Sequence, residues 1–240
     1  MTEQLYKRIS KVFALLLAVT FLVMASLVMT SLAMTWANAD EKAQNQPQNQ
    51  KSDFLNYDMV LGDKNAPIEI IEYASTTCPH CATFHSDILP ELKKKYVDTG
   101  KVKIIFRNYV FSNPFDAFAA SLNRCVSEKK FFPLLGLYFK RQKSWVKYKE
   151  FNELKPYGKY ASLGFAKGEA IKIAKISGMK EVDAYKCLAR EDILKYLMDG
   201  NKIAQEKYGV QSTPAIIVNG KKLDSYDLET IEKAILAVSE

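Results

Sequence analysis

The residues of this 240-residue chain best suited to redox or metal chemistry are its four cysteines and two histidines. Cys78 and Cys81 stand close together in the sequence Cys-Pro-His-Cys, and His85 follows a few residues later. A Cys-x-x-Cys pair can be a redox dithiol, half of a metal site or a pair of inert core thiols. The spacing alone does not distinguish these three possibilities. The secondary structure predicted around the motif is therefore needed to choose between them.

Two predicted strands flank the dithiol. Residues 68–74 form a short, mostly apolar and β-branched run, and residues 102–106 form another. Between them, Pro79 suits the first position of a helix, where its missing N–H is not needed. Apolar residues then recur at helical spacing from Phe84 to Tyr96. The order strand, dithiol at a helix start, helix, strand is the setting in which Cys-x-x-Cys indicates a thioredoxin-like redox motif.

The predicted position of Cys78 at a helix start favours its thiolate, because unpaired N–H groups and the positive end of the helix dipole lie there. Lowering a cysteine pKa from about 8.5 to about 3.5 takes roughly 7 kcal/mol, whereas the dipole supplies at most about 2 kcal/mol. Direct hydrogen bonds must supply the rest. The expected donors are the N–H of Cys81 and either the N–H or the imidazole of His80. Cys81 is expected to be the more buried, resolving thiol.

Two alternatives to a redox dithiol are weaker on the residues present. A structural zinc site needs four ligands, but only Cys78, Cys81 and His85 share one helical face. A pair of inert core thiols would gain nothing from the Pro-His between them. The haem-attachment pattern Cys-x-x-Cys-His fails because Ala82 follows the second cysteine. We expect His85 to be a surface or packing residue of the helix rather than a catalytic one.

The first forty residues are laid out as a secretory signal. Basic residues precede an uncharged stretch at 12–36, and a small-x-small cleavage pattern ends at Ala39. We therefore predict a signal peptide at 1–39 and a polar linker at 40–56. Because the apolar stretch is long enough to span a bilayer, a retained membrane anchor through residues 12–36 is the alternative. Either way the body is exported, where disulfides persist and four cysteines can form two pairs.

The composition disfavours two other classes of protein. The net charge of +7 is spread over short lysine runs interleaved with acidic residues. This pattern disfavours a nucleic-acid-binding protein, which would gather its basic residues on one surface. The sequence has no phosphate-cradling glycine loop and no second metal-binding knuckle, so no cofactor is expected.

Two motifs together carry a resemblance to a known family. Cys-Pro-His-Cys follows a strand ending in EIIEYAS, and YGVQSTPAIIVNG stands far downstream. In this order they resemble the DsbA-like branch of the thioredoxin superfamily, the exported thiol oxidases, over most of residues 58–238. The resemblance implies an α/β protein located in the periplasm. Its thioredoxin fold would comprise residues 57–113 and 208–240, with a helical domain inserted at 114–207.

The resemblance also implies roles for particular residues. Pro214 fills the place of the family's cis-proline, which faces the dithiol, and Thr213 would present its backbone to the substrate beside Cys78. Glu72 matches an acidic residue beneath the active site that helps proton movement at the buried thiol. A solvent-facing strand residue is the alternative for Glu72, and Glu69 shares that ambiguity.

Cys125 and Cys187 match the places where one subset of this family carries a second, structural disulfide. Two separate buried thiols are the alternative. The bridge is expected to be redox-inert, because it lacks the helix-start setting of Cys78. The chain departs from many relatives at Ser75-Thr76-Thr77, which is less aromatic, and this difference is expected to change substrate contacts rather than the chemistry.

The region between the second predicted strand and the downstream motif is too long for a loop and indicates helices. They are predicted as an apolar stripe at 115–126, a segment opened by Pro133 and ending at Phe139, and helices at 169–176, 182–188 and 192–208, with a final helix at 227–238.

The motifs predict an oxidase that passes a Cys78–Cys81 disulfide to reduced or unfolded exported proteins. By resemblance, a DsbB-like membrane quinone reductase would reoxidise it, and the chain would be a monomer. A disulfide isomerase or reductase is the nearest alternative, but its usual N-terminal dimerisation domain does not fit in the roughly 18 residues from Asp40 to Tyr57. A chaperone or binding module is the other alternative, and it would have no use for both thiols.

Overall fold

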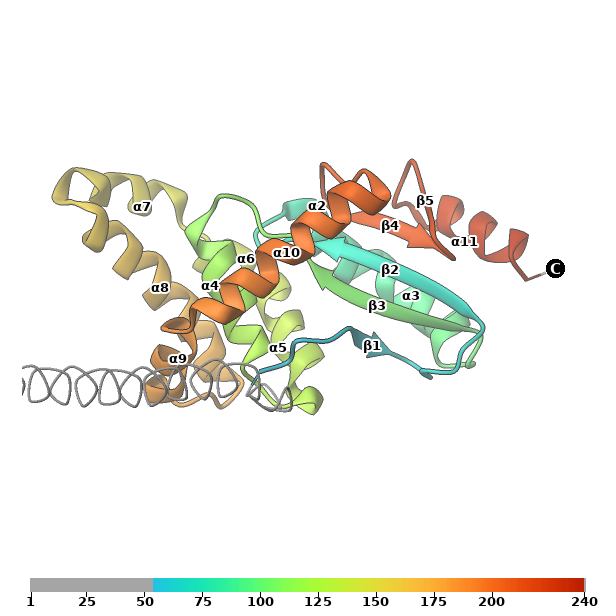
Figure 1. The fold of residues 1–240 in the computed structure, drawn as a ribbon, viewed down its shortest axis with the longest axis horizontal. Coiled ribbons are helices and arrows are strands. Elements are labelled where there is room, and N and C mark those ends of the chain that lie inside the picture. The colour runs from blue at the N-terminus through green and yellow to red at the C-terminus, as the bar shows by residue number, and fades with distance from the viewer. Residues whose placement is uncertain (1–53, 240) are drawn as a thin grey trace, which may run out of the picture. The chain divides into compact units, whose positions relative to one another are not determined.

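The computed structural model describes residues 54–239 (Figure 1). The predicted signal peptide or anchor, at 1–39, lies outside the described residues. A five-stranded sheet has the order β1-β3-β2-β4-β5, with β2 and β3 parallel and the other neighbours antiparallel. The strands are β1 (Met59–Leu61), β2 (Ile68–Ala74), β3 (Val102–Asn108), β4 (Ala215–Val218) and β5 (Lys221–Lys222).

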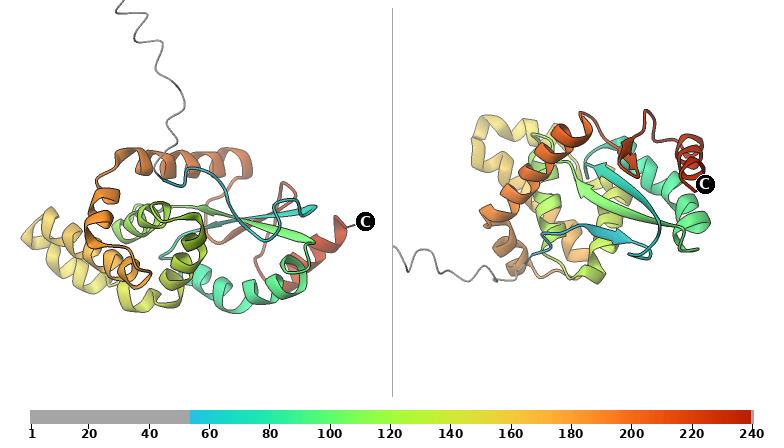
Figure 2. Two further views of the ribbon diagram at one scale, coloured as in Figure 1. Left: turned by 90° about the horizontal axis from the view of Figure 1, so that it is seen from below. Right: turned by 45° about the vertical axis from the view of Figure 1, so that its right-hand side comes forward.

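Side chains alternate between the two faces of this sheet, as the period of a strand requires. Ile70 and Ile216 belong to a core with the helical run after β2 and with α11, whereas Ile71 and Ile217 belong to a core with α10. Figure 2 shows the sheet between these two helical layers. The elements are α2 (Pro79–Thr83), η1 (Phe84–Ile88), α3 (Leu89–Leu92), η2 (Lys93–Val97), α10 (Glu191–Tyr208) and α11 (Leu228–Ala237).

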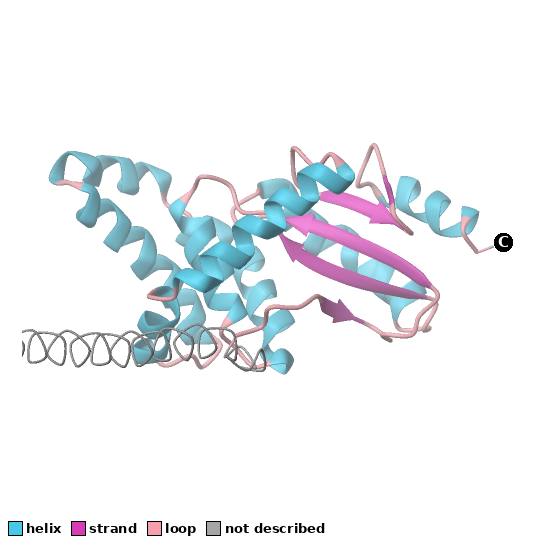
Figure 3. Cartoon of the chain, viewed as in Figure 1, coloured by secondary structure: helices cyan, strands magenta, loops and turns pink. Residues whose placement is uncertain are grey.

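Helices fill the chain between β3 and β4 (Figure 3). They build a core of their own around Phe115, Tyr138 and Trp145. The predicted α/β fold with inserted helices is therefore confirmed. One of them, α10, also reaches the sheet, where Gln205 donates to the Tyr109 hydroxyl at 2.8 Å. The others are α4 (Pro114–Arg124), α5 (Glu128–Lys140), α6 (Gln142–Trp145), α7 (Tyr148–Leu154), η3 (Lys155–Tyr157), α8 (Lys159–Ile176) and α9 (Glu181–Leu188).

The predicted helix after the dithiol is present but irregular. It passes through π-helical turns in η1 and η2. Pro90 explains the first of them, because it has no N–H to give to the Ser86 carbonyl, and a wider turn accommodates the missing bond. The irregularity falls between the dithiol and the far end of the run, so α2 itself keeps the α-helical geometry that matters for the site.

The prediction that Pro133 opens a helix is wrong. The helix α5 begins at Glu128 and contains Pro133 within it. Because Pro133 has no N–H, only the Lys129 carbonyl loses its helical hydrogen bond. Lys129 is exposed, so water can replace that bond. Burial of Phe131 and Leu134 on either side of Pro133 stabilises the helix through it.

Other boundaries also differ from the predictions. The helix expected from 169 begins at Lys159, and β1 was not anticipated. Phe54 and Leu55, assigned to the polar linker, are buried, and the Leu55 N–H donates to the Arg124 carbonyl at 2.8 Å. Packed structure therefore starts before the predicted boundary at 57. Within residues 54–239, no helix combines the length and the apolar content that crossing a membrane requires.

Candidate active site

The dithiol lies where β2 gives way to α2. Cys78 is the N-cap of α2, with an extended backbone, and Pro79 occupies the first turn. The Cys78 N–H donates to the Ser75 carbonyl at 3.1 Å, which closes the turn before the helix. Cys78 is half-buried and Cys81 is fully buried. The structure therefore gives substrate access to one sulfur and shields the other.

The surroundings of Cys78 lower its pKa to about 5. A hydrogen bond with the Cys81 side chain is the largest cause, and burial acts in the opposite direction. The Thr213 side chain and the backbone N–H groups of Cys81 and His80 lower the pKa further. Direct hydrogen bonds at the helix start are thus the main cause of the thiolate's stability, as the limited strength of the dipole requires.

Cys81 has the opposite electrostatic character. Burial raises its pKa most, and the hydrogen bond with Cys78 and the negative charges of Cys78 and Glu72 raise it further. At neutral pH Cys81 therefore carries a proton while Cys78 does not. Any reaction in which Cys81 leaves or attacks must give it a proton or take one away.

The downstream motif folds against the dithiol. The Thr213–Pro214 peptide bond is cis, and Cys78 Sγ lies 3.2 Å from the Thr213 carbonyl oxygen. A groove of about 420 Å³ begins here, lined by His80, Thr213, Pro214 and the segment from Lys222 to Tyr226. The structure thus brings together the residues predicted to form the catalytic and the substrate-binding parts of the site.

His80 uses its backbone and its side chain for different contacts. Its N–H contributes to the lowered pKa of Cys78, whereas its Nδ1 lies 2.9 Å from the Tyr226 hydroxyl. The sequence analysis considered two donors from His80, its N–H and its imidazole. The structure shows that the N–H is the one that acts on Cys78. The imidazole joins the wall of the groove beside Tyr226.

The structure separates Glu72 from Glu69. Glu72 is 1% exposed and faces the dithiol side of the sheet, while Glu69 lies on the other face at 3.7 Å from Lys103. His85 Nε2 lies 3.0 and 3.1 Å from the two Glu72 carboxylate oxygens. His85 is not the surface residue considered from the sequence: its ring is stacked on Phe139, with centroids 4.1 Å apart. This pairing was not anticipated.

His85, the third residue of the possible zinc site, is therefore engaged with Glu72 instead of a metal-binding cluster. Within residues 54–239, no three His, Cys, Asp or Glu side chains gather closely enough to hold a metal ion.

A buried carboxylate that the sequence analysis missed holds the loop before Cys78. Asp116, at the start of α4, accepts hydrogen bonds from the Ser75 and Thr76 hydroxyls, both at 2.7 Å, and from the Thr76 N–H at 2.9 Å. It also accepts from the Phe111 N–H at 3.2 Å. Burial raises the pKa of Asp116 in spite of these bonds. Ser75 and Thr76 are thus buried anchors of the active-site loop rather than substrate-contacting residues.

Gln142 provides a second anchor from the inserted helices. Its Nε2 donates to the carbonyls of Thr76 and Cys78, both at 2.9 Å. No local sequence signal marks this residue, because its partners lie more than sixty positions away. Together with Asp116, it fixes the backbone that presents Cys78.

The second cysteine pair is bonded in the structure. Cys125 and Cys187 form a disulfide with a Cα–Cα distance of 6.1 Å. Cys125 follows the end of α4 and Cys187 lies on α9, and both pack in the core of the inserted helices. Neither cysteine stands at the start of a helix, so this pair lacks the donors that surround Cys78.

Fold and site together define a class of protein. A sheet flanked by helices, a dithiol at the start of the helix after its central strand, an X-Pro bond beside the dithiol and an inserted set of helices form the DsbA-like variant of the thioredoxin fold. A sequence profile described as Thioredoxin matches residues 55–237, and the chain belongs to that family.

Individual relatives agree with this assignment. Wolbachia pipientis alpha-DsbA1 is 28% identical with a TM-score of 0.63, over 75% of this chain and 89% of that one. A protein-disulfide isomerase from Novosphingobium aromaticivorans is 26% identical with a TM-score of 0.66, over 75% and 96% of the two chains. A Rickettsia bellii protein, provisionally named protein-disulfide oxidoreductase, is 32% identical over 74% of this chain. The match spans only 63% of that relative's length.

Proposed function

We propose that this chain is an exported protein thiol:disulfide oxidoreductase that introduces disulfide bonds into substrate proteins through Cys78 and Cys81. The observation that carries the proposal is the asymmetry of the dithiol. The pKa of Cys78 is lowered to about 5, and the pKa of the buried Cys81 is raised. A disulfide whose accessible sulfur is stabilised as a thiolate is readily reduced, so it acts as an oxidant.

The first step uses the accessible sulfur. A substrate thiolate attacks Cys78 Sγ, a substrate–Cys78 disulfide forms, and the Cys78–Cys81 bond breaks. Cys81 leaves with the electron pair and takes a proton, as its raised pKa requires. Pro79 and the N–H of His80 belong to the helix start that orients Cys78 for this attack.

The second step releases the product. A second substrate thiolate attacks the substrate sulfur of the mixed disulfide, and Cys78 leaves as the thiolate that its surroundings stabilise. The substrate has then lost two electrons to the enzyme. Of its two thiol protons, one resides on Cys81 and the other has gone to solvent.

The groove beside Thr213 and Pro214 is the proposed substrate site. The Thr213 carbonyl oxygen lies 3.2 Å from Cys78 Sγ, and the groove continues from it past His80 to Tyr226. An extended substrate segment with its cysteine at Cys78 would run along this wall. Glu72 is proposed as the group that moves the proton of Cys81, since its charge acts on that thiol.

The cellular setting is proposed from the sequence. The signal-like residues 1–39 would direct the protein to the periplasm, with a retained anchor through 12–36 as the alternative. A DsbB-like quinone reductase in the membrane would accept electrons from the reduced dithiol, and reduced exported proteins would be the substrates. The Cys125–Cys187 disulfide is proposed to be structural, and the chain is proposed to act as a monomer with no cofactor.

A disulfide isomerase is a second candidate, favoured by the isomerase title of one structural relative, which this chain covers to 96%. The two functions make different demands. An oxidase starts with the Cys78–Cys81 disulfide and transfers this bond to a reduced substrate. An isomerase starts with the Cys78 thiolate and rearranges disulfides that the substrate already contains.

Refolding of two substrates separates these functions. We expect the oxidised protein to reactivate reduced, unfolded ribonuclease stoichiometrically without other oxidant, and a Cys78→Ser variant to fail. An isomerase would act only on scrambled ribonuclease. If the protein were only a chaperone with this fold, its wild-type and Cys78→Ser forms would suppress aggregation equally well. That result would overturn the proposal.

A further inference from the structure

The pairing of His85 with Glu72 has no role in the reaction as described so far. The two side chains come from different layers, Glu72 from β2 and His85 from η1, and both are largely buried, with side chains 1% and 10% exposed. Both carboxylate oxygens lie within hydrogen-bond distance of the same imidazole nitrogen. The charge of Glu72 also acts on the buried Cys81 thiol, so a carboxylate bonded to an imidazole stands near a thiol whose proton must move.

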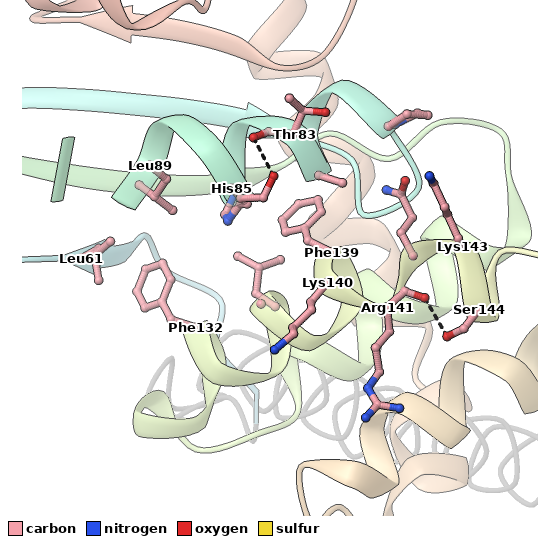
Figure 4. Close-up of a pocket in the computed structure, with 16 residues that line it drawn as sticks. Leu61, Thr83, His85, Leu89, Phe132, Phe139, Lys140, Arg141, Lys143 and Ser144 are labelled. Carbon is pink, nitrogen blue, oxygen red and sulfur yellow. Dashed lines mark hydrogen bonds between the residues drawn. The ribbon is translucent and has the colours of Figure 1, made fainter. Parts of the chain in front are cut away.

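His85 also lines a large cavity that shares no lining residue with the proposed substrate groove. The cavity has a volume of about 1060 Å³ and lies between the helical run after β2 and the helices α5 and α6. Figure 4 shows His85 at its wall, with Phe139 on the α5 side. Within residues 54–239, Glu72 is the only hydrogen-bonding partner of the imidazole. The other ring nitrogen, Nδ1, has no hydrogen bond within these residues, and the His85 side chain, 10% exposed, lines the cavity.

The reaction needs such a route because Cys81 is sealed from water. It is 0% exposed, yet it gains a proton when the dithiol is reduced and loses it when the dithiol is reoxidised. In the reoxidation direction, the proton leaves Cys81, Cys81 attacks Cys78 Sγ in the mixed disulfide, and the leaving thiolate carries the electron pair away.

We propose that His85 acts on Cys81 through Glu72: it relays the Cys81 proton between Glu72 and the solvent of this cavity. Glu72 takes the proton from Cys81 and hands it to His85 Nε2, and the ring releases a proton from Nδ1 to cavity water. Proton uptake by Cys81 follows the same route in reverse. The inference rests on the proposed function, because it matters only if Cys81 takes part in thiol exchange.

The charges around the imidazole are of two kinds. Glu72 faces it from β2 and Cys81 lies on α2, while the cavity wall adds Lys140, Arg141 and Lys143 from α5 and α6. Leu61 of β1 and Phe106 of β3 contribute only apolar surface. The sixteen residues that line the cavity include three basic side chains and no acid. The test therefore compares variants at one ionic strength.

The test follows the resolving step. Reduced enzyme is mixed with glutathione disulfide between pH 5 and 8, quenched with acid, and the Cys78–glutathione intermediate is quantified by mass spectrometry. His85→Gln can still hydrogen-bond to Glu72 but cannot carry a proton. We expect it to slow the decay of the intermediate by roughly 10- to 100-fold at pH 7 and to remove the rise in rate across this pH range. Formation of the intermediate should stay within about twofold, because Cys78 is not altered.

Two controls make the outcome specific. Ser86→Ala, a neighbouring change on the same cavity wall, should leave both steps unaltered. Glu72→Gln/His85→Gln should be no slower than Glu72→Gln alone, since the two groups act in series. If His85→Gln matches the wild type at every pH, or if the two changes multiply, the relay is wrong while thiol exchange stands. If no intermediate forms even in the wild type, the proposed function fails with it.

A second measurement uses the unaltered protein and decides the matter if His85→Gln does not fold. The chain has only two histidines, so the imidazole NMR signal of His85 can be followed with pH. The relay predicts that its titration midpoint coincides with the midpoint of the pH profile of the resolving step. A difference of more than about one pH unit between these midpoints would overturn the proposal.

Discussion

Cys78 and Cys81 lie at the start of α2, whereas Cys125 and Cys187 lie among the inserted helices. The first pair is surrounded by hydrogen-bond donors, a peptide carbonyl and a buried carboxylate, which give its two sulfurs opposite pKa shifts. The second pair packs against apolar neighbours and is already bonded. From this comparison we infer that position relative to a helix start, rather than the cysteine itself, decides whether a pair is suited to exchange electrons or to hold the fold together.

The largest predicted effect concerns the first pair. Replacing Cys78 and Cys81 with alanine should lower thiol-exchange turnover by at least about 1000-fold, because neither Cys125 nor Cys187 stands at a helix start. Turnover of a reduced peptide with glutathione disulfide measures this. Activity that survived in the double variant would mean that Cys125–Cys187 exchanges electrons, and the contrast between the pairs would be lost.

The same change at the second pair should affect stability instead. The Cys125–Cys187 bridge closes a loop of 62 positions, which the chain-entropy view values at about 4 kcal/mol. Cys125→Ala/Cys187→Ala should lower the free energy of unfolding by roughly that amount, measured by urea denaturation, and leave turnover within about twofold. A large loss of turnover in protein that is still folded would contradict a purely structural role.

The loop that presents Cys78 should depend on Asp116. Asp116→Asn replaces one acceptor oxygen with an amide that faces donors, so we expect a loss of about 2–3 kcal/mol in unfolding free energy. The pKa of Cys78 should also rise, because Ser75 and Thr76 lose their anchor. Asp199→Asn is the matched control: its exposed carboxylate forms an ion pair with the exposed Lys195, and the change should cost no more than about 0.5 kcal/mol.

The last effect is a pH dependence confined to the reduced protein, gradual because it is spread over several pH units. The folded-state pKa of Cys78 is depressed to about 5, so its thiolate stabilises the reduced fold fully above the unfolded pKa of about 8.5. That stability declines as pH falls and is gone below about 5. Relative to Cys78→Ala, reduced wild type should lose at most about 1.4 kcal/mol per pH unit in this window. Parallel curves for the two proteins would contradict it.

The sequence was informative where local patterns decide the structure. The strand before Cys78, the helix start at Pro79 and the helical insertion follow from spacing and from turn chemistry. Pro214 came from a family resemblance, because no local pattern reveals that it lies beside Cys78. The error at Pro133 arose because burial of the neighbouring side chains outweighs the bond that proline removes.

The contacts that complete the site were out of reach of the sequence for a physical reason. Asp116 and Gln142 meet the active-site loop across 40 and 66 positions, and nothing local in either segment indicates a buried polar partner. His85 was judged from its helix alone, whereas its environment is set by Glu72 on the sheet and Phe139 on α5. Tertiary packing determines the contacts of such residues, and hydrophobic periodicity in the sequence does not reveal those contacts.

Titration of the reduced protein by thiolate absorbance near 240 nm tests the central claim most directly, with Cys78→Ser as the blank. The account predicts one thiol that ionises with a pKa of about 5, and a signal that is absent from the variant. A wild-type midpoint near 8, as in an ordinary exposed cysteine, would contradict it.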